Sequence, residues 1–168
     1  MSSQTVIGID CGVKYIGISR FDNTQLCDCA YISSSEQDDQ NGARNVFSLV
    51  ENVRVSNILK GVSEDIRVVI EYPEQYAYSP APRSAVQGLA YTGGALTYMF
   101  HYHLSASVQL VLPKEWKGQV PKDIFLKRIE GRLTEQESII LDSKKFSQSK
   151  RHNVVDAIGL GLYYLKRI

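Results

Sequence analysis

The sequence predicts an α/β domain built on a mixed β-sheet, and three observations support this prediction. Short apolar runs recur along the chain, and each has the length of a buried strand. The first three runs are separated only by short turns, which is typical of antiparallel strands. The later runs alternate with segments of helical spacing, which is typical of parallel strands joined by helical crossovers. We expect all 168 residues to form one domain with a core of its own.

The N-terminal part of the chain is predicted to be a meander of three strands. Residues 6–9 form an apolar run, as in a strand that is buried on both faces. The turn sequence DNTQ at residues 22–25 separates the second strand from a third, which alternates weakly between polar and apolar residues. The three strands are expected at residues 5–10, 14–21 and 26–33.

Helices and strands are predicted to alternate in the remainder of the chain. Apolar residues at helical spacing predict a helix over residues 43–60, with Gly61 as its C-cap candidate. Residues 114–121, which contain the only tryptophan, are predicted to form a basic loop. The other expected elements are strands at 66–71 and 107–113 and helices at 84–103, 121–132, 134–141 and 151–166.

The composition is that of an ordinary globular chain, with 43% hydrophobic and 22% charged residues. No apolar run approaches the roughly 18–20 residues of a membrane span, and the N-terminus lacks the basic start of a signal peptide. We therefore expect an intracellular, cytoplasmic protein that does not enter a membrane. Residues 1–112 carry 7 basic and 11 acidic side chains (−4), and residues 113–168 carry 12 and 7 (+5). The basic C-terminal third predicts either a polyanion-binding face or a solvated surface.

Three carboxylates stand at the edges of apolar elements. Asp10 ends the first predicted strand, Glu71 ends the strand at 66–71, and Asp156 lies near the start of the last helix. Because sites in α/β sheets gather at the carboxyl ends of parallel strands, we expect these side chains to meet there. Oxygen-rich clusters select Mg²⁺ or Mn²⁺, and two such ions can hydrolyse a phosphodiester. The pattern predicts a metal-dependent nuclease, although each acid alone could instead serve a turn, a salt bridge or a helix dipole.

A resemblance to a known family rests on three short motifs. Residues 8–17 (GIDCGVKYIG) resemble the first motif of the RuvC-type Holliday junction resolvases, which are members of the RNase H-like superfamily. Residues 70–73 (IEYP) resemble the second acidic strand of that family, and residues 152–162 (HNVVDAIGLGL) resemble its closing helix. The sequence looks most similar to the small RuvC-like proteins of bacteriophages, in which a segment like residues 116–122 (WKGQVPK) also occurs. The order and spacing of the motifs, which span almost the whole chain, make the resemblance specific.

The resemblance implies a fold, an activity and partners. The implied fold is an RNase H-like five-stranded mixed sheet of order 3-2-1-4-5 flanked by helices. The implied protein is a homodimer that acts in DNA recombination and repair. It is expected to nick branched DNA, the four-way junction, with two Mg²⁺ ions in each site, for which Mn²⁺ substitutes. The resemblance also leaves open that the protein is encoded by a phage and acts in the cytoplasm of the host cell.

The family's site residues can be carried over by motif. Asp10, Glu71 and Asp156 match the metal-binding and catalytic carboxylates. The family has a fourth ligand, Asp or His, at the position that Asn153 occupies here, and His152 stands one residue earlier. Both residues share the predicted helical face of Asp156. Asn153 can offer a metal ion a neutral oxygen, and His152 can offer a nitrogen or act as a general acid or base, so both are candidate catalytic residues.

Contacts to DNA are expected from the basic C-terminal third and from the tyrosine-rich loop that follows Glu71. Basic side chains would bind phosphates, and a tyrosine would stack on a base at the junction centre. The candidates are Lys114, Lys117, Lys122, Lys150, Arg151 and Tyr76. A solvated surface and packing within the loop are the alternatives for these residues.

Two other functions stay open on the sequence alone. A YqgF-like RNA-processing nuclease shares the fold and the first motif. A junction-binding protein that is weakened in catalysis is compatible with Asn153 in place of a charged ligand.

Overall fold

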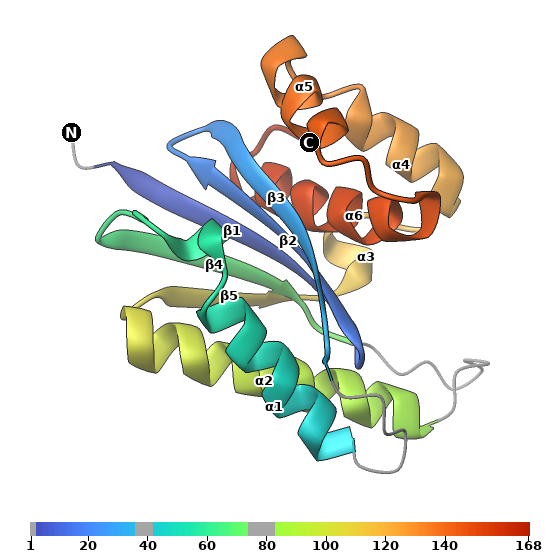
Figure 1. Ribbon diagram of the computed structural model, residues 1–168. Helices are drawn as coiled ribbons and strands as arrows, with labels where there is room; N and C mark the ends of the chain where they lie inside the picture. Colours follow the sequence, from blue (N-terminus) through green and yellow to red (C-terminus); the bar gives the residue numbers. More distant parts are fainter. Residues whose placement is uncertain (1–2, 36–41, 74–82) are drawn as a thin grey trace.

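The computed structural model describes residues 3–35, 42–73 and 83–168. The strands are β1 (Gln4–Cys11), β2 (Tyr15–Asp22), β3 (Gln25–Ser33), β4 (Asp65–Glu71) and β5 (Ser107–Val111). They form one sheet in the order β3-β2-β1-β4-β5, which confirms the expected fold class (Figure 1). β1 pairs with β2, and β2 with β3, in antiparallel orientation, whereas β1–β4 and β4–β5 are parallel.

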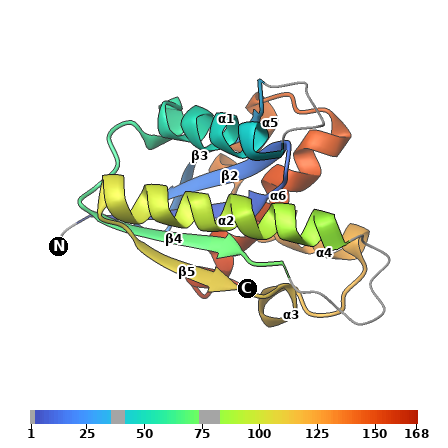
Figure 2. The ribbon, with the colours of Figure 1, turned by 90° about the horizontal axis from the view of Figure 1, so that it is seen from below.

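Two groups of helices cover the two faces of the sheet (Figures 1 and 2). One face is covered by α1 (Gly42–Arg54) and α2 (Arg83–Leu104), and a short 3-10 helix, η1 (Asn57–Leu59), leads from α1 to β4. On the other face lie α4 (Lys122–Glu130), α5 (Glu135–Ser143) and α6 (Gln148–Tyr164). A one-turn helix, α3 (Pro113–Trp116), follows β5. None of the helices in the described ranges combines the length and the hydropathy that a membrane span requires.

The alternation of side chains along β1 divides the core into two halves. Ile7 and Ile9 are fully buried in the half beneath α1 and α2, whereas Val6 is buried in the half beneath α6. Because successive side chains of a strand point to opposite faces, Gly8 and Asp10 lie on the same face as Val6. The carboxylate that ends β1 is therefore directed toward α6.

Glycines in β1 and β2 allow α6 to lie directly against the sheet. A Cβ at Gly8 would overlap the backbone carbonyl of Ala157, and a Cβ at Gly17 would overlap the backbone carbonyl of Asn153. The hydroxyl of Ser19, on the same face, donates to the carbonyl of Ala157 at 2.8 Å. The helix backbone thus takes the space that side chains would fill, and this approach brings the middle of α6 close to the end of β1.

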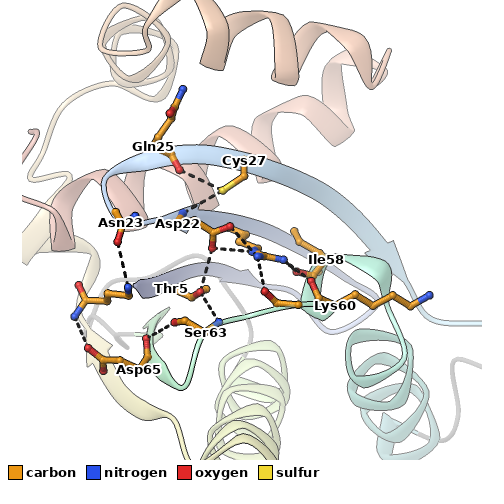
Figure 3. Close-up of polar contacts among 12 residues, drawn as sticks. Thr5, Asp22, Asn23, Gln25, Cys27, Ile58, Lys60, Ser63 and Asp65 are labelled. Atoms are coloured by element: carbon orange, nitrogen blue, oxygen red, sulfur yellow. Dashed lines mark hydrogen bonds and ion pairs between the residues drawn. The ribbon is translucent and has the colours of Figure 1, made fainter. Parts of the chain in front are cut away.

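A network of polar contacts lies at the end of the sheet opposite to Asp10 and Glu71, where the chain enters β1 and β4 (Figure 3). The hydroxyl of Thr5 donates to Oδ1 of Asp22 at 3.0 Å and accepts from the backbone N–H of Ser63 at 3.1 Å. The guanidinium of Arg20 pairs with Asp22 at 2.7 Å and donates to the backbone carbonyl of Lys60 at 2.6 Å. These bonds join β1 and β2 to the segment that leads into β4, and so support the register of the strands.

A buried ion pair ties the C-terminus to α5 and β3. The side chain of Glu137 is fully buried and forms two hydrogen bonds with Arg167, at 2.7 and 2.8 Å. It also accepts from the backbone N–H groups of Leu26 and Thr134, both at 2.9 Å. Burial alone would raise the pKa of Glu137, but the bonds from Arg167 and from the two N–H groups lower it to about 2.

Several predicted boundaries differ from the structure by one or two residues, and three predicted elements differ more. The helix predicted over residues 43–60 ends at Arg54, because the N–H and the hydroxyl of Ser56 both bind the carbonyl of Val53, at 3.1 and 2.6 Å. The predicted basic loop begins instead with α3. The last helix begins at Gln148 rather than at residue 151, directly after Ser147 in extended conformation.

Candidate metal and nucleic-acid site

Asp10 and Glu71 leave the sheet side by side. Ile9 pairs with Ile70 in the parallel ladder of β1 and β4, so the next residue of each strand stands at the same edge of the sheet. Val69 lies in the half of the core beneath α6, and the alternation along β4 therefore directs Glu71 to that face as well. The two carboxylates thus come from neighbouring strand ends and point to the same side.

Asp156 reaches the same place from α6. Its side chain is in the middle of the helix and belongs to the segment that Gly8 and Gly17 allow to approach the sheet. Asp156 is only 6% exposed, which is rare for an acid without a partner or a function.

The three carboxylates line one cavity of about 330 Å³. Its wall includes the turn after β1, the beginning of α2 and the segment that follows α3. The described lining residues are Asp10, Cys11, Gly12, Val13, Tyr15, Glu71, Ala85, Leu89, Lys117, Lys122, Asn153 and Asp156. A second cavity of about 200 Å³ shares Lys117, Lys122 and Asp156 with the first, so the two adjoin. The cavity thus combines acidic ligand candidates with two cations.

The carboxylates interact strongly through their charges. Burial, followed by repulsion from Asp156 and Glu71, raises the pKa of Asp10 well above its usual range. Burial also raises the pKa of Asp156, although Lys117 and Lys122 act in the opposite direction. A cation in this cavity would therefore relieve a repulsion that the fold imposes.

Glu71 is held by two donors from the segment after β5. Nζ of Lys117 lies 2.7 Å from Oε2 of Glu71, and Nε1 of Trp116 donates to the same oxygen at 2.9 Å. Burial alone would lower the pKa of Lys117, but the attraction of Glu71 raises it above its ordinary value. Lys117, which was expected to contact DNA, is thus a cationic partner of a candidate metal ligand in this structure.

The donor set fits a hard divalent cation. Three carboxylates and the amide of Asn153 line the cavity, and oxygen ligands of this kind suit Mg²⁺ and Mn²⁺. Among the described residues, no three acidic, histidine or cysteine side chains are already gathered closely enough to share one ion. Oε2 of Glu71 is bound by Lys117 and by Trp116.

The two candidates for the fourth ligand differ in position. Asn153 lines the cavity, and its Nδ2 donates to the backbone carbonyl of Ser149 at 3.1 Å. His152 is not among the described residues that line the cavity, although its charge favours ionised Asp156. Of the two, Asn153 is the one that can present an oxygen to an ion bound beside Asp156.

The other predicted DNA contacts are dispersed. Lys122 lines the cavity, and Lys114 is exposed on α3. Nζ of Lys150 lies 5.3 Å from the centre of the Tyr31 ring, a cation–π distance. Arg151 pairs with Glu130 at 2.8 Å and with Asp142 at 2.9 Å, and so joins α4 and α5 to α6. Tyr76 lies outside the described residues.

Two residues of the site were missed by the sequence reasoning. Tyr15 lines the cavity and stacks on Tyr31, with ring centres 5.6 Å apart. Trp116 binds Glu71, although residues 114–121 were expected to be a loop. The signal for Trp116 is that it is the chain's only tryptophan, because a buried indole N–H needs an acceptor. Nothing in the local sequence pattern marks Tyr15.

Comparison with known proteins shows the fold. No family model and no curated protein matches this sequence. RuvC from T. thermophilus in complex with a Holliday junction substrate has a TM-score of 0.66 and 16% identity, over 98% of this chain and 95% of that chain. The yeast mitochondrial Holliday junction resolvase has a TM-score of 0.64 and 12% identity, over 96% of this chain and 78% of that chain. The chain therefore has the fold of the RuvC-type Holliday junction resolvases.

Proposed function

We propose that this protein is a Mg²⁺-dependent endonuclease that nicks phosphodiester bonds in branched DNA, with the four-way junction as its principal substrate. The observation that carries the proposal is the convergence of Asp10, Glu71 and Asp156, from β1, β4 and α6, on one cavity. The likeness in fold to a RuvC bound to a Holliday junction substrate supports the choice of substrate.

Asp10, Glu71, Asp156 and Asn153 would hold the metal ions. Divalent ions bound by them would supply an activated water and charge stabilisation at the leaving oxygen. Through the ions that they hold, the carboxylates would also set the position of the scissile phosphate relative to that water. For Glu71 to bind an ion with the others, its carboxylate would have to share or exchange the contact with Lys117.

Lys117 and Lys122 would act on the DNA side of the cavity. Both line it, and Lys122 stands at the start of α4. An ammonium there would neutralise a phosphate oxygen and help to hold the strand in place. We assign weaker, positioning contacts to Lys114, Lys150 and Arg151, and a stacking contact to Tyr76.

The homodimer that paired nicks require has a candidate surface on α2. Tyr91, Tyr98 and Tyr102 follow one another at helical spacing and are 69%, 63% and 68% exposed. The rings of Tyr98 and Tyr102 are stacked, with centres 5.3 Å apart. A second copy packed on this face would bury the rings, so we expect sedimentation analysis to give a dimer for the wild type and a monomer for Tyr98→Glu.

Cleavage of a labelled synthetic four-way junction in Mg²⁺ tests the function, with linear duplex DNA and an RNA stem as competing substrates. Symmetric nicks on the junction alone, lost in Asp10→Asn with the fold intact, are the expected result. Cleavage of RNA only would favour a YqgF-like RNA-processing nuclease. Junction binding without cleavage in Mg²⁺ or Mn²⁺ would favour a catalytically weakened protein. The uncharged Asn153, at the position of the fourth ligand, is the reason to consider this alternative.

A further inference from the structure

We propose that Trp116 is a positioning residue, whose indole N–H holds the Glu71 carboxylate in place for ion binding. The inference rests on the proposed function, since it gives Glu71 the role of a metal ligand. Trp116 would not touch the ion or the DNA and would act only through Glu71.

The hydrogen bond joins two parts of the chain that are remote in sequence. Nε1 of Trp116 donates to Oε2 of Glu71 at 2.9 Å, across 45 positions. Trp116 is only 7% exposed, so its N–H has little access to water and needs a protein acceptor. The acceptor that the fold provides is a candidate metal ligand rather than a backbone carbonyl.

The indole ring has little freedom to move. Phe125 of α4 packs against it edge to face, with ring centres 5.1 Å apart and planes at 78°. On α6, a Cβ at Gly159 would lie 2.7 Å from the ring atom Cζ3, so the ring lies directly against the helix backbone there. Gly159 is three positions after Asp156, one turn along the same helix. The ring therefore contacts the helix that carries one ligand while its N–H holds another.

The second partner of Glu71 is less rigid than the first. Lys117 binds the same oxygen at 2.7 Å, and its Nζ lies 5.0 Å from the centre of the Trp116 ring. A lysine side chain has several rotatable bonds, whereas the packed indole has a fixed direction. Without the N–H, the mobile ammonium of Lys117 would be the remaining side-chain partner of Glu71 among the described residues, and the carboxylate could turn away from Asp10 and Asp156. Partners of metal ligands commonly have this orienting role.

The test removes the N–H and keeps an aromatic ring at position 116. One variant is Trp116→Phe. In a second, the only tryptophan is replaced by benzothienylalanine, which has sulfur in place of the N–H. We expect both proteins to fold natively, as measured by circular dichroism. Mn²⁺ binding to the DNA-free protein, measured by calorimetry, should weaken about 10–100-fold, while KM for the junction changes by less than about twofold. Phe125→Leu is the control, because it loosens the packing and keeps the N–H.

The outcomes separate this inference from the proposed function. Wild-type Mn²⁺ affinity in the benzothienylalanine protein would overturn the positioning role, even if Trp116→Phe failed to fold. An equal loss of affinity in Phe125→Leu would also overturn it, because the effect would then belong to packing. If the wild type itself bound no divalent ion and cut no DNA, the proposed function would fail first.

Discussion

Gly17 of β2 lies directly beneath the backbone carbonyl of Asn153 in α6, and this contact leaves no space for a side chain. Gly17 is also the partner of Asp10 in the β1–β2 ladder. The distance between strand and helix at this point thus sets how close Asp156, three positions after Asn153, comes to Asp10. The geometry of the candidate metal site depends on the absence of one methyl group.

Gly17→Ala is expected to destabilise the protein and to reduce cleavage. The added Cβ would overlap backbone rather than a flexible side chain, so α6 must move, at a cost of about 1–3 kcal/mol in the free energy of unfolding. Urea denaturation and junction cleavage measure the two effects. Gly93→Ala is the matched control: apart from its chain neighbours and its own helix backbone, no heavy atom of the described residues lies within 4 Å of its added Cβ, and alanine should favour the helix by about 1 kcal/mol. Equal stability of Gly17→Ala and wild type would contradict the argument.

Asp10→Asn is expected to raise the thermal stability of the protein in a chelator. Burial and repulsion from Asp156 and Glu71 make an ionised Asp10 costly to the folded state, and an amide removes this cost. A gain of about 1 kcal/mol would correspond to roughly 2–4 °C in Tm for a chain of this size. Melting curves with EDTA and with excess Mg²⁺ provide the comparison. With Mg²⁺ the order should reverse, because only the wild type gains the full binding energy; a variant that melts lower in both buffers would give Asp10 a structural role.

Asn153→Asp is expected to strengthen divalent-ion binding. The amide lines the cavity beside Asp156, and a carboxylate there would add a fourth negative charge to the ligand set. Because affinity for hard cations rises with ligand charge, the Mg²⁺ concentration for half-maximal cleavage should fall on the order of tenfold. Asn153→Ala, which removes the oxygen, should raise the Mg²⁺ concentration for half-maximal cleavage. An unchanged Mg²⁺ dependence in both variants would mean that position 153 does not reach the ion.

Low pH is expected to reduce the free energy of unfolding, because Glu137 becomes protonated. Its pKa in the folded state is lowered to about 2, so the stabilisation is complete above the ordinary glutamate range and is lost as pH falls from there toward 2. A shift of this size corresponds to about 3 kcal/mol at neutral pH. Glu137→Gln should lose a similar amount at pH 7 and show a flatter stability profile between about pH 5 and 2. Unfolding by urea at several pH values measures this, with Glu64→Gln, an exposed acid, as the control.

The strands of the sheet and the proximity of Asp10, Glu71 and Asp156 could be predicted because the relevant sequence signals are local. Apolar runs that end in Asp10 and Glu71 identify strand ends, and the parallel pairing of Ile9 with Ile70 then places the acids side by side. The helical position of Asp156 follows from the apolar pattern around it. The strand order itself was implied by the resemblance rather than by periodicity, since alternation does not specify which strands are neighbours.

The partners of Glu71 could not be predicted because they depend on contacts between distant segments. Trp116 and Lys117 lie 45 and 46 positions after Glu71, and the charge of Lys117 looked like that of any surface lysine. The helix α3 was missed because four residues that begin with a proline are too short for a periodic pattern. The end of α1 was misjudged because the hydroxyl of Ser56, rather than Gly61, ends the helix.

The intrinsic fluorescence of the single tryptophan reports on the candidate site. The indole is the chain's only one, and it is hydrogen-bonded to a carboxylate that lines the cavity. Indole emission responds to nearby charge, so an ion that binds Glu71 should change the fluorescence of Trp116. If the proposed function is right, divalent-ion binding should be measurable by fluorescence on unlabelled protein, without any DNA present.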